Sequence, residues 1–201
     1  MNGWFPLYLR SRRLPAALVT SLAAVVVTWL AWSAATDRRE VDQSLTLLTV
    51  TLALAPMIPT LAGDDDALEA TAALRWRPRR AVHLIACFAV VAAALAVTRA
   101  TGAWFGPTWE VVRDSAGLTG LIGLSAALLG TRLAWAPPIG WTAVQVIFHQ
   151  PAGNAALLWL IQPAGSRPAA LTAAVLFAAG VLTYAVRPGP RTNPAEVTMG
   201  Q

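Results

Sequence analysis

The sequence predicts an all-α, polytopic membrane protein with about six transmembrane helices. The 201 residues are 56% hydrophobic and 12% charged, whereas soluble domains carry about 25% charged residues. The mean hydropathy is +0.55. The charged residues gather in short segments between long runs of Ala, Leu and Val, which is the pattern of membrane spans and their loops. This composition argues against a disordered chain, a disulfide scaffold and an ordinary soluble enzyme.

Five apolar runs approach the length of about 20 residues that a helix needs to cross a bilayer. They predict spans at residues 14–35, 44–62, 81–97, 116–134 and 169–186. Pro56 and Pro59 are expected to bend the last turns of the second span. Small residues let helix backbones approach each other, so the glycines of the fourth span predict close helix packing. The glycines concerned are Gly117, Gly120 and Gly123, and Gly130 lies near the end of the same span.

The region between residues 137 and 163 is interrupted, and two interpretations of it stay open. The apolar run 137–148 is followed by a polar break that includes His149, Gln150 and Asn154, and then by a second short apolar piece. Neither piece is long enough to cross alone, and a polar break cannot face lipid. One interpretation is a single helix kinked at Pro151. We favour a short span at 137–148 followed by a re-entrant hairpin at 149–163, because Pro, Gly and Asn together stop a helix.

The break also supplies candidate pathway residues. His149, Gln150 and Asn154 are polar groups that are expected near the outer surface, where they would line a transport pathway.

The arginines predict the orientation of the chain. All fifteen basic side chains are arginines, and with six crossings and a cytoplasmic N-terminus, ten lie inside and five outside. Both chain ends are therefore expected in the cytoplasm, with residues 1–187 as one transmembrane domain in the plasma membrane and 188–201 as a disordered tail. The pI of about 10.9 reflects these flanking arginines, so we expect the lipid bilayer and no nucleic acid as a partner.

Residues 3–13 predict an interfacial helix ahead of the first span. Trp4 and Tyr8 share one face of this helix, and Arg12 and Arg13 follow at its end. Such a helix lies flat among the lipid headgroups, either as a simple anchor or as an element that moves with a partner.

The loop between the second and third spans predicts a cytoplasmic helix at 64–77. Asp66 can cap its start, with Glu69 three residues later as in a capping box. Pro78 is expected to end this helix before the third span. The helix either docks on another protein or rests on the membrane as a capped loop helix. Its candidate docking residues are Asp64, Asp65, Asp66, Leu68, Glu69, Arg75, Trp76 and Arg77.

Motifs for catalytic chemistry are scarce. The aspartate cluster has no second cluster with which to bind Mg²⁺, and His83 and His149 are not spaced as haem ligands. Ser125 lacks a Gly-x-Ser-x-Gly elbow, and a chain without Lys has no phosphate-binding loop. We therefore expect no enzyme activity, no metal and no cofactor in this chain. No Asp or Glu is expected deep in any span, which argues against ion coupling and favours driving by another subunit.

The order of these elements resembles the membrane subunit of ABC-2-type transporters, the type V exporter fold, and in particular small actinobacterial permeases. Residues 4–14 resemble the connecting helix of that family, 64–80 its coupling-helix loop and 149–162 its outer re-entrant hairpin. The resemblance implies an exporter of a small amphipathic compound, peptide or lipid. It also implies a second membrane subunit, identical or different, and a separate ABC ATPase subunit that holds ATP and Mg²⁺.

Two other functions stay open at this stage. One is a non-transporting membrane interaction protein, such as an immunity or accessory protein. The other is a small intramembrane enzyme that acts through His83 or His149.

Overall fold

The computed structural model describes residues 14–62, 76–148 and 154–186 of the chain, and in this part it is all-helical. The α-helices are α2 (Leu14–Ala35), α3 (Gln43–Leu54), α5 (Trp76–Val97), α6 (Thr108–Leu129), α7 (Ala136–Ile147) and α8 (Arg167–Val186). There are also three short 3₁₀ helices: η1 (Ala55–Leu61) and η2 (Thr98–Ala100) directly continue α3 and α5, and η3 (Trp159–Ile161) lies between α7 and α8. The one β pairing among the described residues is an isolated bridge between Glu40 and Trp104.

Five helical segments are long and apolar enough to cross a membrane, which confirms the coarse prediction of a polytopic membrane protein. They comprise Leu14–Ala35, Gln43–Leu61, Trp76–Ala100, Thr108–Leu129 and Arg167–Val186. The predicted fifth span, 137–148, corresponds to α7, which has 12 residues. At 1.5 Å per residue α7 is about 18 Å long, well short of a hydrocarbon core of about 30 Å.

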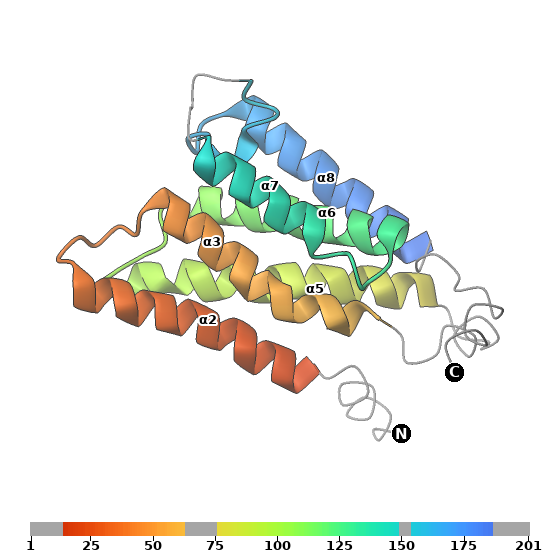
Figure 1. The fold of residues 1–201 in the computed structure, drawn as a ribbon, viewed down its shortest axis with the longest axis horizontal. Helices are drawn as coiled ribbons and strands as arrows, with labels where there is room; N and C mark the ends of the chain where they lie inside the picture. Colours follow the sequence, from red (N-terminus) through yellow and green to blue (C-terminus); the bar gives the residue numbers. More distant parts are fainter. Residues whose placement is uncertain (1–13, 63–75, 149–153, 187–201) are drawn as a thin grey trace.

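The six α-helices run alternately in opposite directions, so that Leu14 and Val186 lie at the same end of the bundle (Figure 1). We call the other end the polar end; it holds the loops 36–42 and 101–107 and the segment 154–166. We call the end with Leu14 and Val186 the opposite end. The turn at 130–135 and the first turn of α5 also lie there.

Helices α6 and α8 lie side by side and run in the same direction (Figure 1). A Cβ added to Gly120 would collide with the backbone of α8 at Leu176 and Phe177, and one added to Gly180 would collide with Gly120. A Cβ on Gly123 would lie 2.6 Å from Leu84 Cδ2 of α5. The predicted role of glycine in close helix packing is therefore confirmed.

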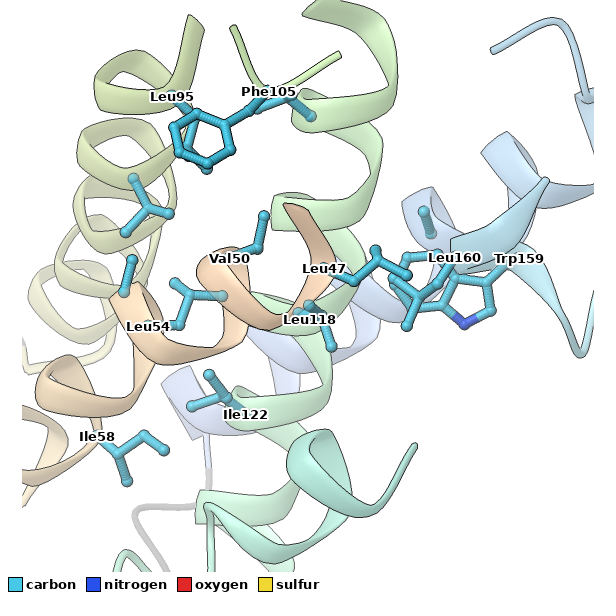
Figure 2. Close-up of a cluster of buried hydrophobic side chains, with 14 of the residues drawn as sticks. Leu47, Val50, Leu54, Ile58, Leu95, Phe105, Leu118, Ile122, Trp159 and Leu160 are labelled. Atoms are coloured by element: carbon cyan, nitrogen blue, oxygen red, sulfur yellow. The ribbon is translucent and has the colours of Figure 1, made fainter. Parts of the chain in front are cut away.

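The hydrophobic core is centred on α3 (Figure 2). Side chains of α3 and η1 meet α6 on one side and α5 on the other, and η3 contributes the largest of them, Trp159. The residues labelled in Figure 2 are Leu47, Val50, Leu54, Ile58, Leu95, Phe105, Leu118, Ile122, Trp159 and Leu160. By contrast, α2 fully buries just Ala17, Ser21 and Val25, and its Trp29 and Trp32 are partly buried against the core.

The second span, Gln43–Leu61, begins and ends one residue earlier than the predicted 44–62. Asp42 caps α3, since its Oδ2 accepts a hydrogen bond of 2.9 Å from the Ser44 amide. Pro56 and Pro59 convert the last turns to the 3₁₀ helix η1, so the span tightens where a bend was expected.

The third span begins earlier than the predicted residue 81, and Pro78 lies inside it. Trp76 and Arg77 form the first turn of α5, and Pro78 is the third residue of that helix. A proline is tolerated in a first turn because the amide it lacks would have no partner there.

The fourth span also moves toward the N-terminus, from the predicted 116–134 to Thr108–Leu129. Gly130 ends α6 because its φ of +82° lies in the region that favours glycine.

Several predicted features lie outside the described residues. They are the interfacial helix 3–13 with Trp4, Tyr8, Arg12 and Arg13, the segment Asp64, Asp65, Asp66, Leu68, Glu69 and Arg75, the residues His149 and Gln150, and the tail 188–201.

Candidate functional site

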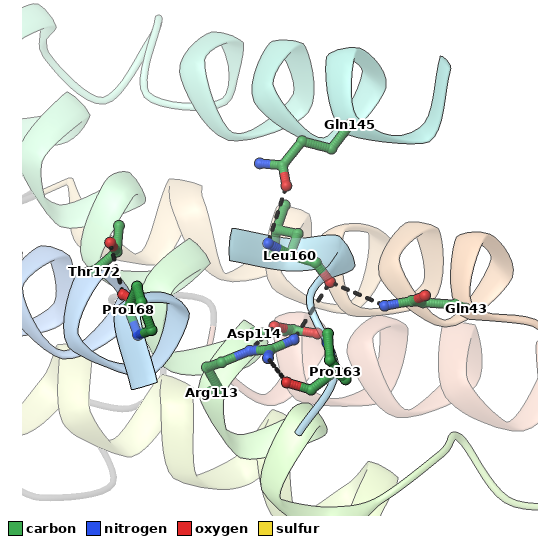
Figure 3. A network of polar contacts seen from close by, with 8 residues as sticks. All are labelled: Gln43, Arg113, Asp114, Gln145, Leu160, Pro163, Pro168 and Thr172. Atoms are coloured by element: carbon green, nitrogen blue, oxygen red, sulfur yellow. Dashed lines mark hydrogen bonds and ion pairs between the residues drawn. The ribbon is translucent and has the colours of Figure 1, made fainter. Parts of the chain in front are cut away.

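A buried hydrogen-bond network surrounds the backbone of Leu160 at the polar end (Figure 3). The Leu160 amide donates to Gln145 Oε1 of α7 at 2.9 Å. The Leu160 carbonyl accepts from Gln43 Nε2 of α3 at 3.3 Å and from Arg113 Nη2 of α6 at 3.4 Å. One residue of the segment 154–163 is therefore bonded to three helices.

Arg113 and Asp114 form an ion pair inside the bundle. The distance from Arg113 Nε to Asp114 Oδ1 is 2.8 Å, and the two side chains are 1% and 4% exposed. Arg113 also donates to the carbonyl oxygen of Pro163 at 3.2 Å (Figure 3). A buried ion pair is stable when further hydrogen bonds satisfy its charged groups. The guanidinium of Arg113 makes two such bonds, to the carbonyl groups of Leu160 and Pro163.

This pair corrects the predicted start of the fourth span. Asp114 is buried about two turns into α6, so an acidic residue lies within this span, nearer to its start than to its centre. The predicted span began at residue 116 because charged residues were assigned to the loop, but an arginine paired with its neighbour can enter the helix bundle.

Trp159 anchors the segment 154–163 to α6. It is 1% exposed, and a Cβ on Gly117 would collide with its indole ring. Asn154 opens the segment: its side-chain Oδ1 accepts from the amides of Ala156 at 3.0 Å and Leu157 at 3.4 Å. Asn154 is therefore a turn residue in this structure. A single kinked helix does not describe the region, because α7 ends at Ile147 and η3 follows these turns.

A cavity of about 630 Å³ opens beside this network, between α6 and the loops 36–42 and 101–107. The loops are tied together, since the Val41 amide donates to the Trp104 carbonyl at 2.9 Å and the Trp104 amide to the Arg39 carbonyl at 2.8 Å. Trp29 of α2 donates to the Ala103 carbonyl at 3.0 Å and braces the second loop. The two loops at the edge of the cavity are therefore held in place by hydrogen bonds.

Charged residues line this cavity. Its ionisable side chains are Arg38, Arg39, Glu40, Asp42, Glu110 and Asp114. Those of the loop 38–42 are exposed at the mouth, Glu110 is half-buried, and Asp114 lies at the floor with Thr46 and Phe105. Among the described residues the ion pair between Arg113 and Asp114 is the one salt bridge. The carboxylates at the mouth therefore make no salt bridge to a described arginine.

The predicted site residues do not gather in the described part of the chain. Trp76 and Arg77 lie at the start of α5, at the opposite end from the cavity, and Trp76 stacks on Arg79 with 5.6 Å from the guanidinium carbon to the ring centroid. Asn154 does not line the cavity. The sequence reading missed Glu110 and Arg113. The charged segment directly before the glycine-rich apolar run could have revealed them, because it fits a helix that starts earlier than residue 116.

A second polar cluster connects helices at the opposite end. Thr60 Oγ1 of η1 lies 2.9 Å from His83 Nε2 of α5. The Tyr184 hydroxyl of α8 donates to the Leu61 carbonyl of η1 at 2.6 Å. His83 therefore has a structural contact between helices, and η1 is bonded to both α5 and α8.

No family model, curated protein or solved structure matches the chain. Within the described segments, no group of three or more His, Cys, Asp or Glu residues could hold a metal ion. The geometry of the chain itself is therefore the basis for assigning a function.

Proposed function

We propose that this chain is the membrane-spanning permease subunit of an ABC-type exporter, driven by a separate ATPase subunit. The observation that carries the proposal is the broken segment before the last helix. Residues 154–163 are too irregular to cross a membrane, yet Arg113, Gln43 and Gln145 fix them to the bundle. A hairpin at this position is what the resemblance to ABC-2-type permeases implies.

The proposed topology has six crossings, with α7 as a short fifth one, and a re-entrant piece at 149–163. The alternating helix directions support it, because they bring Leu14 and Val186 to one end (Figure 1). That end also carries the arginines at the start of α5 and Arg132. The segments 1–13, 63–75 and 187–201, which adjoin this end in the sequence, contain six further arginines, so ten of the fifteen count toward it and five toward the polar end. By the positive-inside rule this end faces the cytoplasm, and the polar end faces outward. The host membrane is the plasma membrane.

The proposed mechanism passes movement from the ATPase subunit to the helices. The segment 64–77, which includes Trp76 and Arg77 at the start of α5, docks on that subunit, and it follows η1 in the chain. Because Thr60 contacts His83 and Tyr184 is bonded to Leu61, a push on the loop acts on α5 and α8 together. ATP and Mg²⁺ are held by the partner.

The substrate path is proposed to lie between this chain and a second membrane subunit, which is either another copy or a different chain. In support, the space between α3 and α6 beside Thr51, Leu118 and Ile122 is too narrow for a water molecule, so a substrate would not pass between these two helices. The cargo is a small amphipathic compound, peptide or lipid.

Purification from the native membrane tests the ATPase partner. The tagged chain is isolated in mild detergent, co-purifying proteins are identified by mass spectrometry, and ATPase activity is measured. The double variant Asp66→Arg/Glu69→Arg is expected to lose the ATPase subunit. Glu196→Arg, a charge reversal in the C-terminal tail, is the matched control and should retain it.

An ATPase that stays bound to the double variant would refute the coupling role of this loop. Isolation of the wild-type chain without any ATPase, but with another membrane protein, would favour the interaction or accessory function instead.

Cysteine labelling tests the topology. In a Cys87→Ala background, Gly102→Cys at the polar end should react with a membrane-impermeant maleimide on intact cells, since a Cβ at Gly102 meets nothing within 4 Å. Leu133→Cys at the opposite end, where the native side chain is 53% exposed, should react after permeabilisation alone. The reverse pattern would overturn the orientation, and labelling of both on intact cells would overturn the crossing of α6.

A further inference from the structure

We propose that the cavity at the polar end is a binding site for an organic amine, held through its ammonium group by Glu40 and Glu110. This inference does not rest on the proposed transport function, because it concerns binding to the isolated chain. Three features carry it: the convergence of two carboxylates, an unsatisfied hydroxyl at the floor, and the size and lining of the cavity.

The two carboxylates approach each other across Gly106. Glu40 Oε1 and Glu110 Oε2 each lie 3.8 Å from the position of a Cβ on Gly106, so the two oxygens are at most twice that distance apart. Gly106 has a φ of +75°, which leaves this position open where a side chain would be strained. Two carboxylates so close repel each other, and a cation between them relieves that repulsion.

The floor of the cavity holds a polar group with no partner. Thr46 lines the cavity and is 6% exposed, and its hydroxyl makes no hydrogen bond within the described part of the chain. Buried hydroxyl groups nearly always have a partner, so this one calls for a ligand group or a bound water. Asp114, which also lines the cavity, is likewise buried.

The size and composition of the cavity favour an organic cation over a metal ion or an anion. A volume of about 630 Å³ is that of a small-molecule site. Glu40, Asp42 and Glu110 face the guanidinium groups of Arg38 and Arg39 in its lining, and the charge of Asp114 is balanced by Arg113, which leaves an excess of one negative charge. Trp104 adds an aromatic surface to the lining, and aromatic rings attract alkylammonium groups.

Calorimetric titration of the purified chain tests this site. The chain is placed in nanodiscs of phosphatidylglycerol and titrated with phenethylamine, which is protonated at neutral pH. The neutral analogue of the same shape is 2-phenylethanol. The amine is expected to bind at least about tenfold more tightly than the alcohol, a difference of about 1.4 kcal/mol.

Variants then assign the site to its residues. Glu40→Gln/Glu110→Gln should weaken amine binding at least about tenfold, and Thr46→Val about threefold, since it removes one neutral hydrogen-bonding group. Asp37→Asn is the matched control, because Asp37 is exposed in the same loop but does not line the cavity. It should change the affinity less than about twofold.

The outcomes are distinct. Equal binding of the amine and the alcohol would overturn the proposal. So would unchanged amine affinity in a folded Glu40→Gln/Glu110→Gln variant; Glu40→Gln alone, at an exposed position, covers a failure of the double variant to fold. If these results support the site, the phenethylamine titration is repeated in nanodiscs that contain phosphatidylethanolamine, which identifies the source of the amine. Suppressed phenethylamine binding there indicates a lipid headgroup, and unchanged binding indicates a soluble amine.

Discussion

Replacement of Gly120 by alanine should push α6 and α8 apart. The added Cβ would collide with backbone atoms of Leu176 and Phe177, which cannot turn aside as a side chain can. Overpacking of this kind costs about 1–3 kcal/mol, and a backbone contact belongs at the upper end of that range. Alanine in a helix regains up to about 1 kcal/mol of propensity, so the expected net loss of stability is about 2 kcal/mol.

Gly140→Ala is the matched control. Gly140 lies in α7, and a Cβ there would meet nothing within 4 Å. This variant should keep the propensity gain without the collision, so it should be as stable as the wild type or more stable by up to about 1 kcal/mol.

The single cysteine provides the assay. Cys87 is buried, so a thiol-reactive dye added during a thermal ramp reports the opening of the bundle. For a chain of this size about 2 kcal/mol corresponds to a drop in Tm of roughly 4–8 °C. A Tm for Gly120→Ala at or above that of Gly140→Ala would refute the close packing of α6 on α8.

Three further substitutions can be followed by the same dye. Arg113→Ala leaves Asp114 buried without its partner and should destabilise the chain by about 3–5 kcal/mol. The double variant Arg113→Ala/Asp114→Ala should recover part of this loss. An equal loss of stability in both variants would contradict the pairing. Gly117→Ala should be destabilising alone but nearly neutral in a Trp159→Ala background, because the ring it meets is then absent; additive losses would contradict that contact. Tyr184→Phe removes the hydrogen bond to η1 and should lower stability by about 1–2 kcal/mol, so an unchanged Tm would exclude that bond.

Helices bounded by charge could be predicted well from the sequence. The predicted span 14–35 coincides with α2, and 169–186 differs from α8 by two residues at its start. In both cases a long apolar run ends at charged residues, so that local composition decides the boundary. The short apolar run 137–148 likewise matches α7 within one residue at each end.

The boundaries that failed depend on tertiary contacts. Residue-by-residue hydropathy places Arg113 outside a span, because it does not register that the side chain is neutralised by Asp114 and by carbonyl groups 47 and 50 residues away. The cavity was unpredictable for the same reason, since Glu40 and Glu110 come from separate segments. Their convergence at Gly106 follows from the pairing of two loops, which no local pattern encodes.

The hydrogen bonds to the backbone of Leu160 hold three helices together at the polar end. If α3, α6 or α7 slid past its neighbours near Leu160, at least one hydrogen bond to the peptide groups of Leu160 would break. For α6, that bond comes from the charged guanidinium of Arg113. The hydrogen bonds to Leu160 therefore join α3, α6 and α7 at the polar end, so that these three helices are held there as one unit.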